Sequence, residues 1–277
     1  MQTDFFRDDE IVMNSEVIRN KNGFICDMDG VLYHGNILLP GVREFVDWLQ
    51  REKKRFCFLT NSSERSPREL GEKLARLGID VNQGVFYTSA LATAQFLASQ
   101  HPGGSAYVIG EAGLTNALYD AGFSMNEINP DYVIVGETKS YSFEKMTRAI
   151  HCVLQGAKLI GTNPDLTDRF EEGIVPATRA LVAPIELVTG KQAYYIGKPN
   201  PLMMRHALKK IGCTPEETLV IGDRMDTDIV AGIEAGIDTM LVLSGVTSRA
   251  EMDDFPYRPA FVLNGVGEIV ETPPASS

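Results

Sequence analysis

The sequence has few of the residues that build disulfide frameworks and zinc sites. Among its 277 residues, four are cysteine and four are histidine. No two cysteines form a CxxC pair, and the histidines show neither an HExxH motif nor any other zinc spacing. Cys26 and Cys57 lie inside apolar, strand-like runs. We therefore expect buried free thiols of a reducing compartment, which argues against a disulfide-stapled domain and against a zinc enzyme.

Long apolar runs and basic clusters are also absent. No apolar stretch approaches the length of a membrane-spanning helix, and the first ten residues, MQTDFFRDDE, lack the basic and apolar regions of a signal peptide. The net charge is −11, and an acidic fold without a basic patch repels the phosphate backbone of nucleic acids. We therefore predict a cytoplasmic protein that binds neither a membrane nor a nucleic acid duplex.

Apolar segments of two kinds alternate along the chain. Short buried-strand runs such as 24–28 and 56–60 are followed by amphipathic helices, as where Val42, Phe45, Val46 and Leu49 fall at i, i+3, i+4 and i+7. After the linker-like residues 101–105 a second strand–helix set begins, and the first pattern resumes beyond Gly197. This alternation predicts an α/β fold with a mostly parallel sheet and helices on both faces.

The second set is expected to contain five strands and two helices. Residues 163–180 are polar and are expected to be irregular. The expected strands are 107–109, 132–135, 158–161, 185–188 and 193–196, and the expected helices are 114–121 and 143–154.

Carboxylates follow two of the strands expected in the first set. Asp27 and Asp29 end the first strand, and Asp223 follows a later strand with Asp226 and Asp228 close behind. In parallel sheets, ligands bind at the carboxyl ends of the strands. Carboxylates that meet there repel one another unless a hard cation such as Mg²⁺ neutralises them. A carboxylate can also attack phosphorus and form an aspartyl-phosphate.

Donors and a cation stand at the other expected loops of this edge. Thr60 and Asn61 end the second strand, and Lys198 precedes the strand of Asp223, so together they can bind a phosphoryl group. Asp29, two residues from Asp27, can protonate a leaving oxygen and then deprotonate a water. Gly30 allows a tight backbone turn beside the site.

Each of these signals has a plain structural alternative when taken alone. A DxD sequence occurs in many loops, a lysine before proline is usually a solvated turn residue, and a TNS triplet commonly caps a helix. Their occurrence together, in this order and at strand ends, favours a catalytic site.

Four segments carry a family resemblance in order: DMDGVL at 27–32, LTN at 59–61, KP at 198–199 and GDRMDTD at 222–228. They resemble the four motifs of the haloacid dehalogenase (HAD) superfamily. Further segments resemble its NagD-like, p-nitrophenylphosphatase-type branch: FYTSA at 86–90, VGET at 135–138, TNPD at 162–165, YIGKP at 195–199 and LVLSGV at 241–246. The resemblance covers residues 23–262, and the segment before Phe24 has no counterpart in it.

The resemblance implies a Rossmann-like HAD core with an inserted α/β cap domain. Residues 1–103 and 194–277 would form the core, and residues 104–193 the cap that selects the substrate. It also implies a Mg²⁺-dependent phosphatase that hydrolyses small phosphomonoesters, such as nucleoside monophosphates and sugar phosphates. Caps of this branch often mediate dimers, so the resemblance is compatible with a homodimer, and the sequence leaves the oligomeric state open.

The resemblance implies roles for individual residues of the core. Asp27 would be the nucleophile and Asp29 the general acid and base. The metal would be held by the Asp27 carboxylate, the Asp29 backbone carbonyl and Asp223. The phosphoryl group would be bound by Thr60, Asn61 and Lys198, with Asp228 and Gly30 in support.

Three cap residues are candidates for substrate selection: Asn163, Asp165 and Arg179. Where relatives tend to carry small, glycine-rich residues after Pro176, this chain has Ala177-Thr178-Arg179. Our hypothesis is that Arg179 contacts an anionic or polar leaving group. The alternative is a surface arginine that pairs with Glu171 or Glu172.

Two other functions fit parts of the same pattern. A phosphotransferase would pass the phosphoryl group to a hydroxyl other than water, and analysis of products formed with an added acceptor distinguishes it. A non-catalytic sensor would bind phosphate and Mg²⁺ without turnover. Asp29 argues against the sensor, because such a protein needs no acid or base two residues from its acceptor.

Overall fold

The computed structural model describes residues 16–170 and 173–270, and these form two compact units. The first unit comprises the described parts of Met1–Phe58, Arg76–Ile79 and Ala207–Ser277. The second comprises Leu59–Ala75 and Asp80–His206. Among the helices of the described residues, none has both the length and the apolar character needed to span a membrane.

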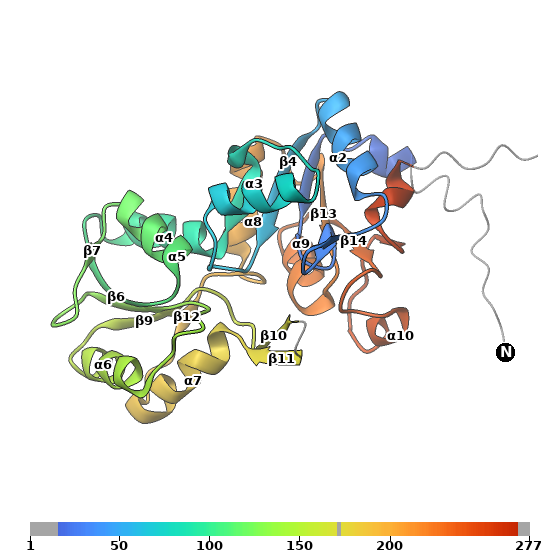
Figure 1. Cartoon of the computed structure of the whole chain (residues 1–277). Helices are drawn as coiled ribbons and strands as arrows, with labels where there is room; N and C mark the ends of the chain where they lie inside the picture. Colours follow the sequence, from blue (N-terminus) through green and yellow to red (C-terminus); the bar gives the residue numbers. More distant parts are fainter. Residues whose placement is uncertain (1–15, 171–172, 271–277) are drawn as a thin grey trace, which may run out of the picture. The chain divides into compact units, whose positions relative to one another are not determined.

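The first sheet has six strands in the order β15-β14-β13-β1-β4-β5 (Figure 1). The pairings of β15 with β14, β14 with β13, β13 with β1 and β1 with β4 are parallel. Its strands in chain order are β1 (Gly23–Cys26), β4 (Arg55–Thr60), β5 (Phe86–Thr88), β13 (Thr218–Gly222), β14 (Asp238–Val242) and β15 (Phe261–Leu263). The strands predicted near residues 24 and 56 are β1 and β4.

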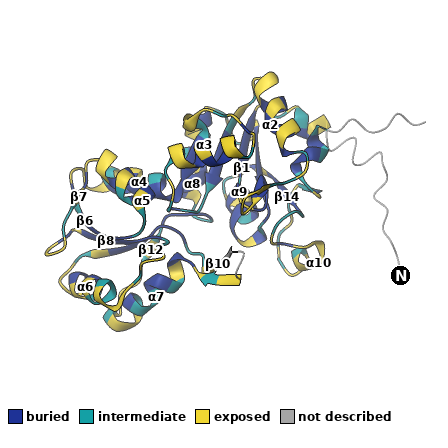
Figure 2. Ribbon diagram, in the orientation of Figure 1, coloured by how far each residue is buried: buried dark blue, intermediate teal, exposed yellow. Residues whose placement is uncertain are grey.

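The core of the first unit is built against β1, all of whose residues are buried. Helix α2 (Val42–Arg51) buries the predicted i, i+3, i+4, i+7 stripe. Phe24 of β1 makes edge contacts with Phe45 and Trp48 of that helix, with ring centroids 6.4 and 5.5 Å apart. In Figure 2 the strands of this sheet are dark blue while the outer face of α2 is yellow, so the helix covers the sheet with one face only.

The second sheet has five strands in the order β12-β9-β8-β6-β7, and all of its pairings are parallel. In chain order these are β6 (Ser105–Ile109), β7 (Ser124–Met125), β8 (Tyr132–Val135), β9 (Lys158–Gly161) and β12 (Tyr194–Tyr195). Helices α6 (Phe143–Leu154) and α7 (Thr178–Thr189) bury an apolar cluster with β6, β8 and β9. Helices α4 (Ser89–Gln100) and α5 (Ala112–Asp120) lie on the other side of this sheet (Figure 1).

Two predictions for the second set were wrong. Residues 185–188 lie within α7 and form no strand. A short apolar run does not distinguish a strand from a helix. Here Leu181 and Ile185 are buried at helical spacing, whereas Leu187 is 84% exposed. The stretch 163–180, expected to be irregular, contains the antiparallel hairpin of β10 (Thr167–Phe170) and β11 (Gly173–Pro176).

The remaining elements are short helices, helical turns and a two-stranded hairpin that lie between or after the strands of the two large sheets along the chain. Helix α3 begins with a capping box: Glu69 N donates to Ser66 Oγ at 3.3 Å, and Ser66 N donates to Glu69 Oε2 at 2.8 Å. These elements are β2 (Tyr33–His34), β3 (Ile37–Leu38), α3 (Pro67–Arg76), η1 (Gln83–Val85), α8 (Pro201–Ile211), η2 (Met225–Ile229), α9 (Val230–Glu234), α10 (Arg249–Met252) and η3 (Val266–Ile269).

Candidate active site

Three carboxylates of the first unit form a compact cluster. Asp27 follows β1, Asp223 follows β13, and Asp228 lies in the π-helical turn η2, with carboxylate oxygens of all three within 4.8 Å of one another. The parallel register places Cys26 beside Ile221, and Asp27 N donates to Ile221 O at 2.8 Å. Neighbouring strands therefore deliver the first two carboxylates to one edge of the sheet.

The cluster has the donor set of a hard cation. Asp223 and Asp228 are only 2% and 1% exposed, and Asp27 is partly buried. Buried carboxylates at this spacing repel one another, and that repulsion is relieved by a bound cation or by protons. The all-oxygen ligands fit a divalent metal such as Mg²⁺.

Backbone from two loops approaches Asp223 closely. Val246 N donates to Asp223 Oδ2 at 2.7 Å. A Cβ atom on Gly30 or on Gly245 would lie 2.4 or 2.0 Å from that oxygen, and Gly30 also has a φ of +77°. Both positions therefore require glycine. Gly30 was among the predicted site residues and Gly245 was not, although Gly245 lies in the family-like segment LVLSGV at 241–246.

The Asp29 side chain lies outside this cluster. It is 71% exposed, and its Oδ1 lies 3.7 Å from His34 Nδ1. His34 Nε2 in turn contacts Ser244 O at 2.6 Å, which fixes the ring beside the carboxylate. An exposed carboxyl group can exchange protons with substrate or water, whereas the buried members of the cluster are better suited to a metal.

Asp226 and Asp228, which the sequence places together, have different surroundings. Asp228 Oδ2 accepts a hydrogen bond from Arg224 N at 3.2 Å and points into the cluster. Asp226 pairs with the Arg224 guanidinium, with Oδ2 2.9 Å from Nη2, and its side chain is 54% exposed.

In the second unit, Asn61 and Lys198 are joined by hydrogen bonds. Lys198 N donates to Asn61 Oδ1 at 2.7 Å, and Asn61 Nδ2 donates to Lys198 O at 3.0 Å. The Lys198 side chain is buried, with Nζ 3.5 Å from Leu59 O. Thr60, at the end of β4, accepts a hydrogen bond from Ser62 N at 3.1 Å through its Oγ1.

The cap candidates Asn163 and Asp165 bond directly to Asn61. Asn163 is fully buried and its Nδ2 donates to Asn61 O at 2.8 Å, while Asn61 Nδ2 donates to Asp165 Oδ2 at 2.9 Å. Arg179 is exposed in the first turn of α7, and its backbone N donates to Asp165 O at 3.0 Å. Its alternative partners Glu171 and Glu172 lie outside the described residues.

Glu137 belongs to the same hydrogen-bonded group, although it was not among the predicted site residues. Its Oε2 accepts from Ser63 N at 2.8 Å, and its Oε1 accepts from Asn163 Nδ2 at 2.8 Å. Burial raises the pKa of Glu137 to about 7, while these donors act in the opposite direction. The sequence did carry a signal for Glu137, because Gly136-Glu137 directly follows β8. Asp223 directly follows β13 in the same way.

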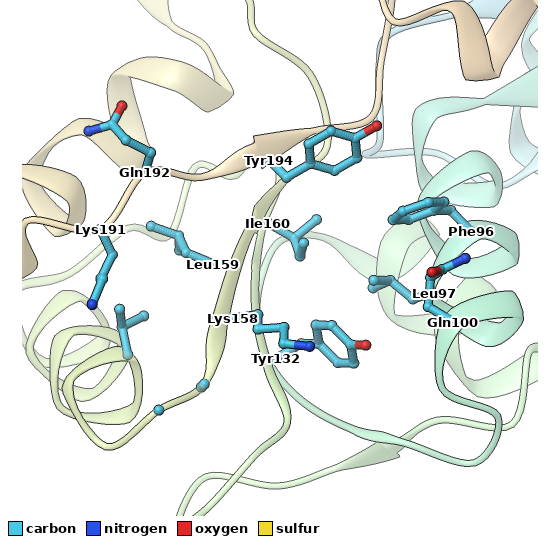
Figure 3. A pocket seen from close by; sticks show the side chains of 13 residues that line it. Phe96, Leu97, Gln100, Tyr132, Lys158, Leu159, Ile160, Lys191, Gln192 and Tyr194 are labelled. Carbon is cyan, nitrogen blue, oxygen red and sulfur yellow. The ribbon is translucent and has the colours of Figure 1, made fainter.

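A separate hollow of about 550 Å³ lies in the second unit (Figure 3). The aromatic rings of Phe96, Tyr132 and Tyr194 line it, together with Lys158 and Lys191. None of the predicted site residues lines this hollow, so it is distinct from the groups described above.

Comparison with known proteins identifies the family. Residues 24–124 match the family described as haloacid dehalogenase-like hydrolase, and residues 195–269 match the one described as HAD-hydrolase-like. The chain belongs to the haloacid dehalogenase-like hydrolases.

Individual relatives place it in the NagD-like branch. The chain is 47% identical over 248 residues to dihydroxyacetone phosphatase of Corynebacterium glutamicum, with 90% of each chain covered. It is 46% identical over 245 residues to the ribonucleotide monophosphatase NagD of Escherichia coli, covering 88% of this chain and 96% of that one. The solved structure of NagD from E. coli K-12 superposes with a TM-score of 0.85 at 44% identity, covering 90% of this chain and 98% of NagD.

These relatives confirm the predicted family, fold class and enzyme class. The chain is a HAD-type α/β protein of the NagD-like branch, and its enzyme class is that of the phosphoric monoester hydrolases.

Proposed function

We propose that this enzyme hydrolyses small phosphomonoesters with Mg²⁺ through an aspartyl-phosphate on Asp27. The observation that carries the proposal is the convergence of Asp27, Asp223 and Asp228. It supplies a nucleophile beside a set of metal ligands. The named activities of relatives, on dihydroxyacetone phosphate and on ribonucleotide monophosphates, support substrates that are small phosphorylated metabolites.

Two carboxyl groups would share the chemistry. An Asp27 oxygen attacks phosphorus, the bond between phosphorus and the leaving oxygen breaks, and Asp29 donates its proton to that oxygen. Asp29 then takes a proton from a water whose oxygen attacks the phosphorus of the aspartyl-phosphate. The Asp27–phosphorus bond breaks, which releases inorganic phosphate and restores the Asp27 carboxylate. The exposure of the Asp29 side chain supports this role, because an exposed carboxyl group can exchange protons with solvent.

The other predicted residues would bind charge. Asp27, the Asp29 backbone carbonyl and Asp223 would hold Mg²⁺, with Asp228 and Gly30 in support. The metal would supply positive charge to neutralise the carboxylates and the phosphoryl oxygens. Thr60, Asn61 and the Lys198 ammonium group would bind the phosphoryl group, which needs donors on its equatorial oxygens.

Turnover of p-nitrophenyl phosphate, followed by a screen of phosphorylated metabolites, tests this proposal. We expect Mg²⁺-dependent release of inorganic phosphate from both kinds of substrate. Absence of hydrolysis with retained phosphate binding would favour the non-catalytic sensor. Transfer of the phosphoryl group to an added alcohol in preference to water would favour a phosphotransferase.

The division into core and cap is part of the proposal. Residues 1–103 and 194–277 would form the catalytic core, and residues 104–193 the cap that selects the substrate. Four of the five strands of the second sheet, β6 to β9, lie between Ser105 and Gly161, inside the proposed cap, while β12 (Tyr194–Tyr195) lies just beyond it. A homodimer and a cytoplasmic location stay predictions, the second supported by four free cysteines, of which three are buried.

Arg179→Ala is expected to change the order in which substrates are preferred. Arg179 is exposed and is tied through its backbone to Asp165, whose carboxylate accepts from Asn61. Loss of one charge-assisted contact should lower kcat/KM by about tenfold for substrates whose leaving group carries a negative charge of its own. The value for p-nitrophenyl phosphate should be unchanged. Kinetics on a panel of metabolites check this, and an unchanged ranking would show that Arg179 is a surface residue.

A further inference from the structure

Glu137 joins the loops that follow two different strands. On one side, Ser63 N and Ser63 Oγ, from the loop after β4, donate to Glu137 Oε2 at 2.8 and 3.1 Å. On the other side, Asn163 Nδ2, from the loop after β9, donates to Oε1 at 2.8 Å. Ser63 and Asn163 are fully buried, so water cannot readily replace these bonds. All of these residues belong to the second unit.

The same contacts reach Asn61 and Lys198. Asn163 Nδ2 also donates to Asn61 O at 2.8 Å, and Ser63 lies two residues beyond Asn61 in the same loop. The Asn61 side chain accepts from Lys198 N and donates to Lys198 O. Glu137 is therefore connected to Asn61 by hydrogen bonds through Asn163. Asn61 in turn sets the backbone position of Lys198.

The ionised form of Glu137 fits this arrangement best. Oε2 accepts from the N–H and the hydroxyl of Ser63, Oε1 accepts from the Asn163 amide, and a neutral carboxyl group accepts hydrogen bonds more weakly than a carboxylate. Ser63 Oγ has little freedom to adapt, because it also lies 3.3 Å from both Glu137 N and Thr162 Oγ1, which donate to it. Protonation would thus weaken the hydrogen bonds that hold the two loops together.

We propose that the Glu137 carboxylate is a positioning group for phosphoryl binding, which fixes Asn61 and the Lys198 backbone through Ser63 and Asn163 and releases them when it is protonated. This inference rests on the proposed function, because it takes Asn61 and Lys198 as the phosphoryl-binding residues.

The pH at which this release occurs follows from the surroundings of Glu137. The pKa of Glu137 is raised to about 7: burial and the charge of Glu64, on the loop after β4, raise it, while the donors from Ser63 and Asn163 lower it. The other charged groups nearby are Asp165, which accepts from Asn61, and the four that act on Glu64, namely Arg65, Lys139, Glu111 and Asp168. Since the ionised form is the ordered one, phosphoryl binding should be complete above pH 7 and should be lost as the pH falls through 7.

The first test compares Glu137→Gln with the wild type across pH 5.5–8.5. The substitution keeps the size of the side chain but turns one acceptor into a donor. A misplaced binding group lowers kcat/KM on the order of 100-fold. At pH 8.5 we therefore expect kcat/KM of the wild type to be about 100 times that of Glu137→Gln. It should fall to about 3 at pH 5.5, where the wild-type carboxyl is itself mostly protonated. A ratio that stays constant with pH would overturn the proposal.

Two further variants separate positioning from general damage. Glu186→Gln is the matched control, because Glu186 of α7 also accepts from a backbone N–H, that of Ala193 at 2.7 Å, and Ala193 belongs to neither of the two loops nor to the loop of Glu137. It should keep the wild-type pH profile. Ser63→Ala removes one donor to the Glu137 carboxylate and should therefore raise its pKa. The acidic limb of the plot of kcat/KM against pH should then move to higher pH by roughly half a unit. An unmoved limb in Ser63→Ala would contradict the proposal even if Glu137→Gln failed to fold.

A readout independent of catalysis separates this inference from the proposed function. In ¹⁵N–¹H spectra of the full chain, the amide signals of Ser63 and Lys198 should shift with a common midpoint near pH 7. That midpoint should be unchanged in Glu186→Gln and absent in Glu137→Gln. If the amides titrate in this way but no phosphomonoester is hydrolysed, the proposed function fails, while the link between Glu137 ionisation and the position of Lys198 stands. If hydrolysis occurs and the amides do not titrate, the link fails.

Discussion

Asp27→Asn is expected to lower kcat for p-nitrophenyl phosphate by at least about 10⁴-fold. The carboxylate follows β1 and lies in the acidic cluster, partly buried, where it can reach a phosphorus atom. An amide is a far weaker nucleophile, so the aspartyl-phosphate would no longer form. Steady-state release of p-nitrophenol measures the loss.

Two controls make this result specific to the nucleophile. Asp47→Asn on the exposed face of α2 also removes one carboxylate from the first unit, and it should keep wild-type kinetics. Thermal unfolding should show that Asp27→Asn is folded, since a neutral side chain relieves repulsion within the cluster. Turnover in this variant within tenfold of the wild type would rule out a covalent intermediate on Asp27.

Removal of the divalent metal is expected to abolish hydrolysis, and Asp223→Asn is expected to weaken metal binding. Asp223 is 2% exposed and its Oδ2 is held by Val246 N, so its carboxylate has a fixed position toward Asp27 and Asp228. Loss of one ligand charge should raise the Mg²⁺ concentration for half-maximal activity. It should also lower kcat on the order of 10³-fold, because metal charge contributes several kcal/mol to such reactions.

The matched control is Asp253→Asn. Asp253 is also an aspartate of the first unit, but its side chain is 71% exposed and pairs with Arg258 outside the cluster. We expect an unchanged Mg²⁺ dependence in this variant. Chelation followed by return of Mg²⁺ should restore the wild type fully. Full activity in the presence of excess chelator would contradict a metal-dependent mechanism.

The elements that carry the catalytic motifs were predicted because their signals are local. Buried strands such as β1 and β13 appear as short apolar runs, and α2 shows its helical stripe directly. Asp27 and Asp223 stand immediately after such runs, so the rule that ligands bind at strand ends led to them. The run 185–188 was assigned wrongly, because four apolar residues fit a strand as well as one face of α7.

Residues whose role depends on distant contacts were harder to predict. Gly245 is required because its backbone lies against Asp223, and nothing within its own segment shows this. Glu137 follows a strand as Asp223 does, yet its partners Ser63 and Asn163 lie 74 and 26 residues away. A carboxylate in sequence shows neither its burial nor the donors around it.

The sequence by itself determined the family, the alternation of strands and helices and the order of the four motifs, because these depend on residues that are neighbours along the chain. Only the tertiary structure decided which carboxylates share one cluster. It brought Asp228 to Asp27 and Asp223 and paired Asp226 with Arg224 instead. It also decided that Glu137 is linked to Asn61 through one side chain, that of Asn163. The physical reason is that strand register and loop packing set these distances, and both depend on contacts between segments that are distant in the sequence.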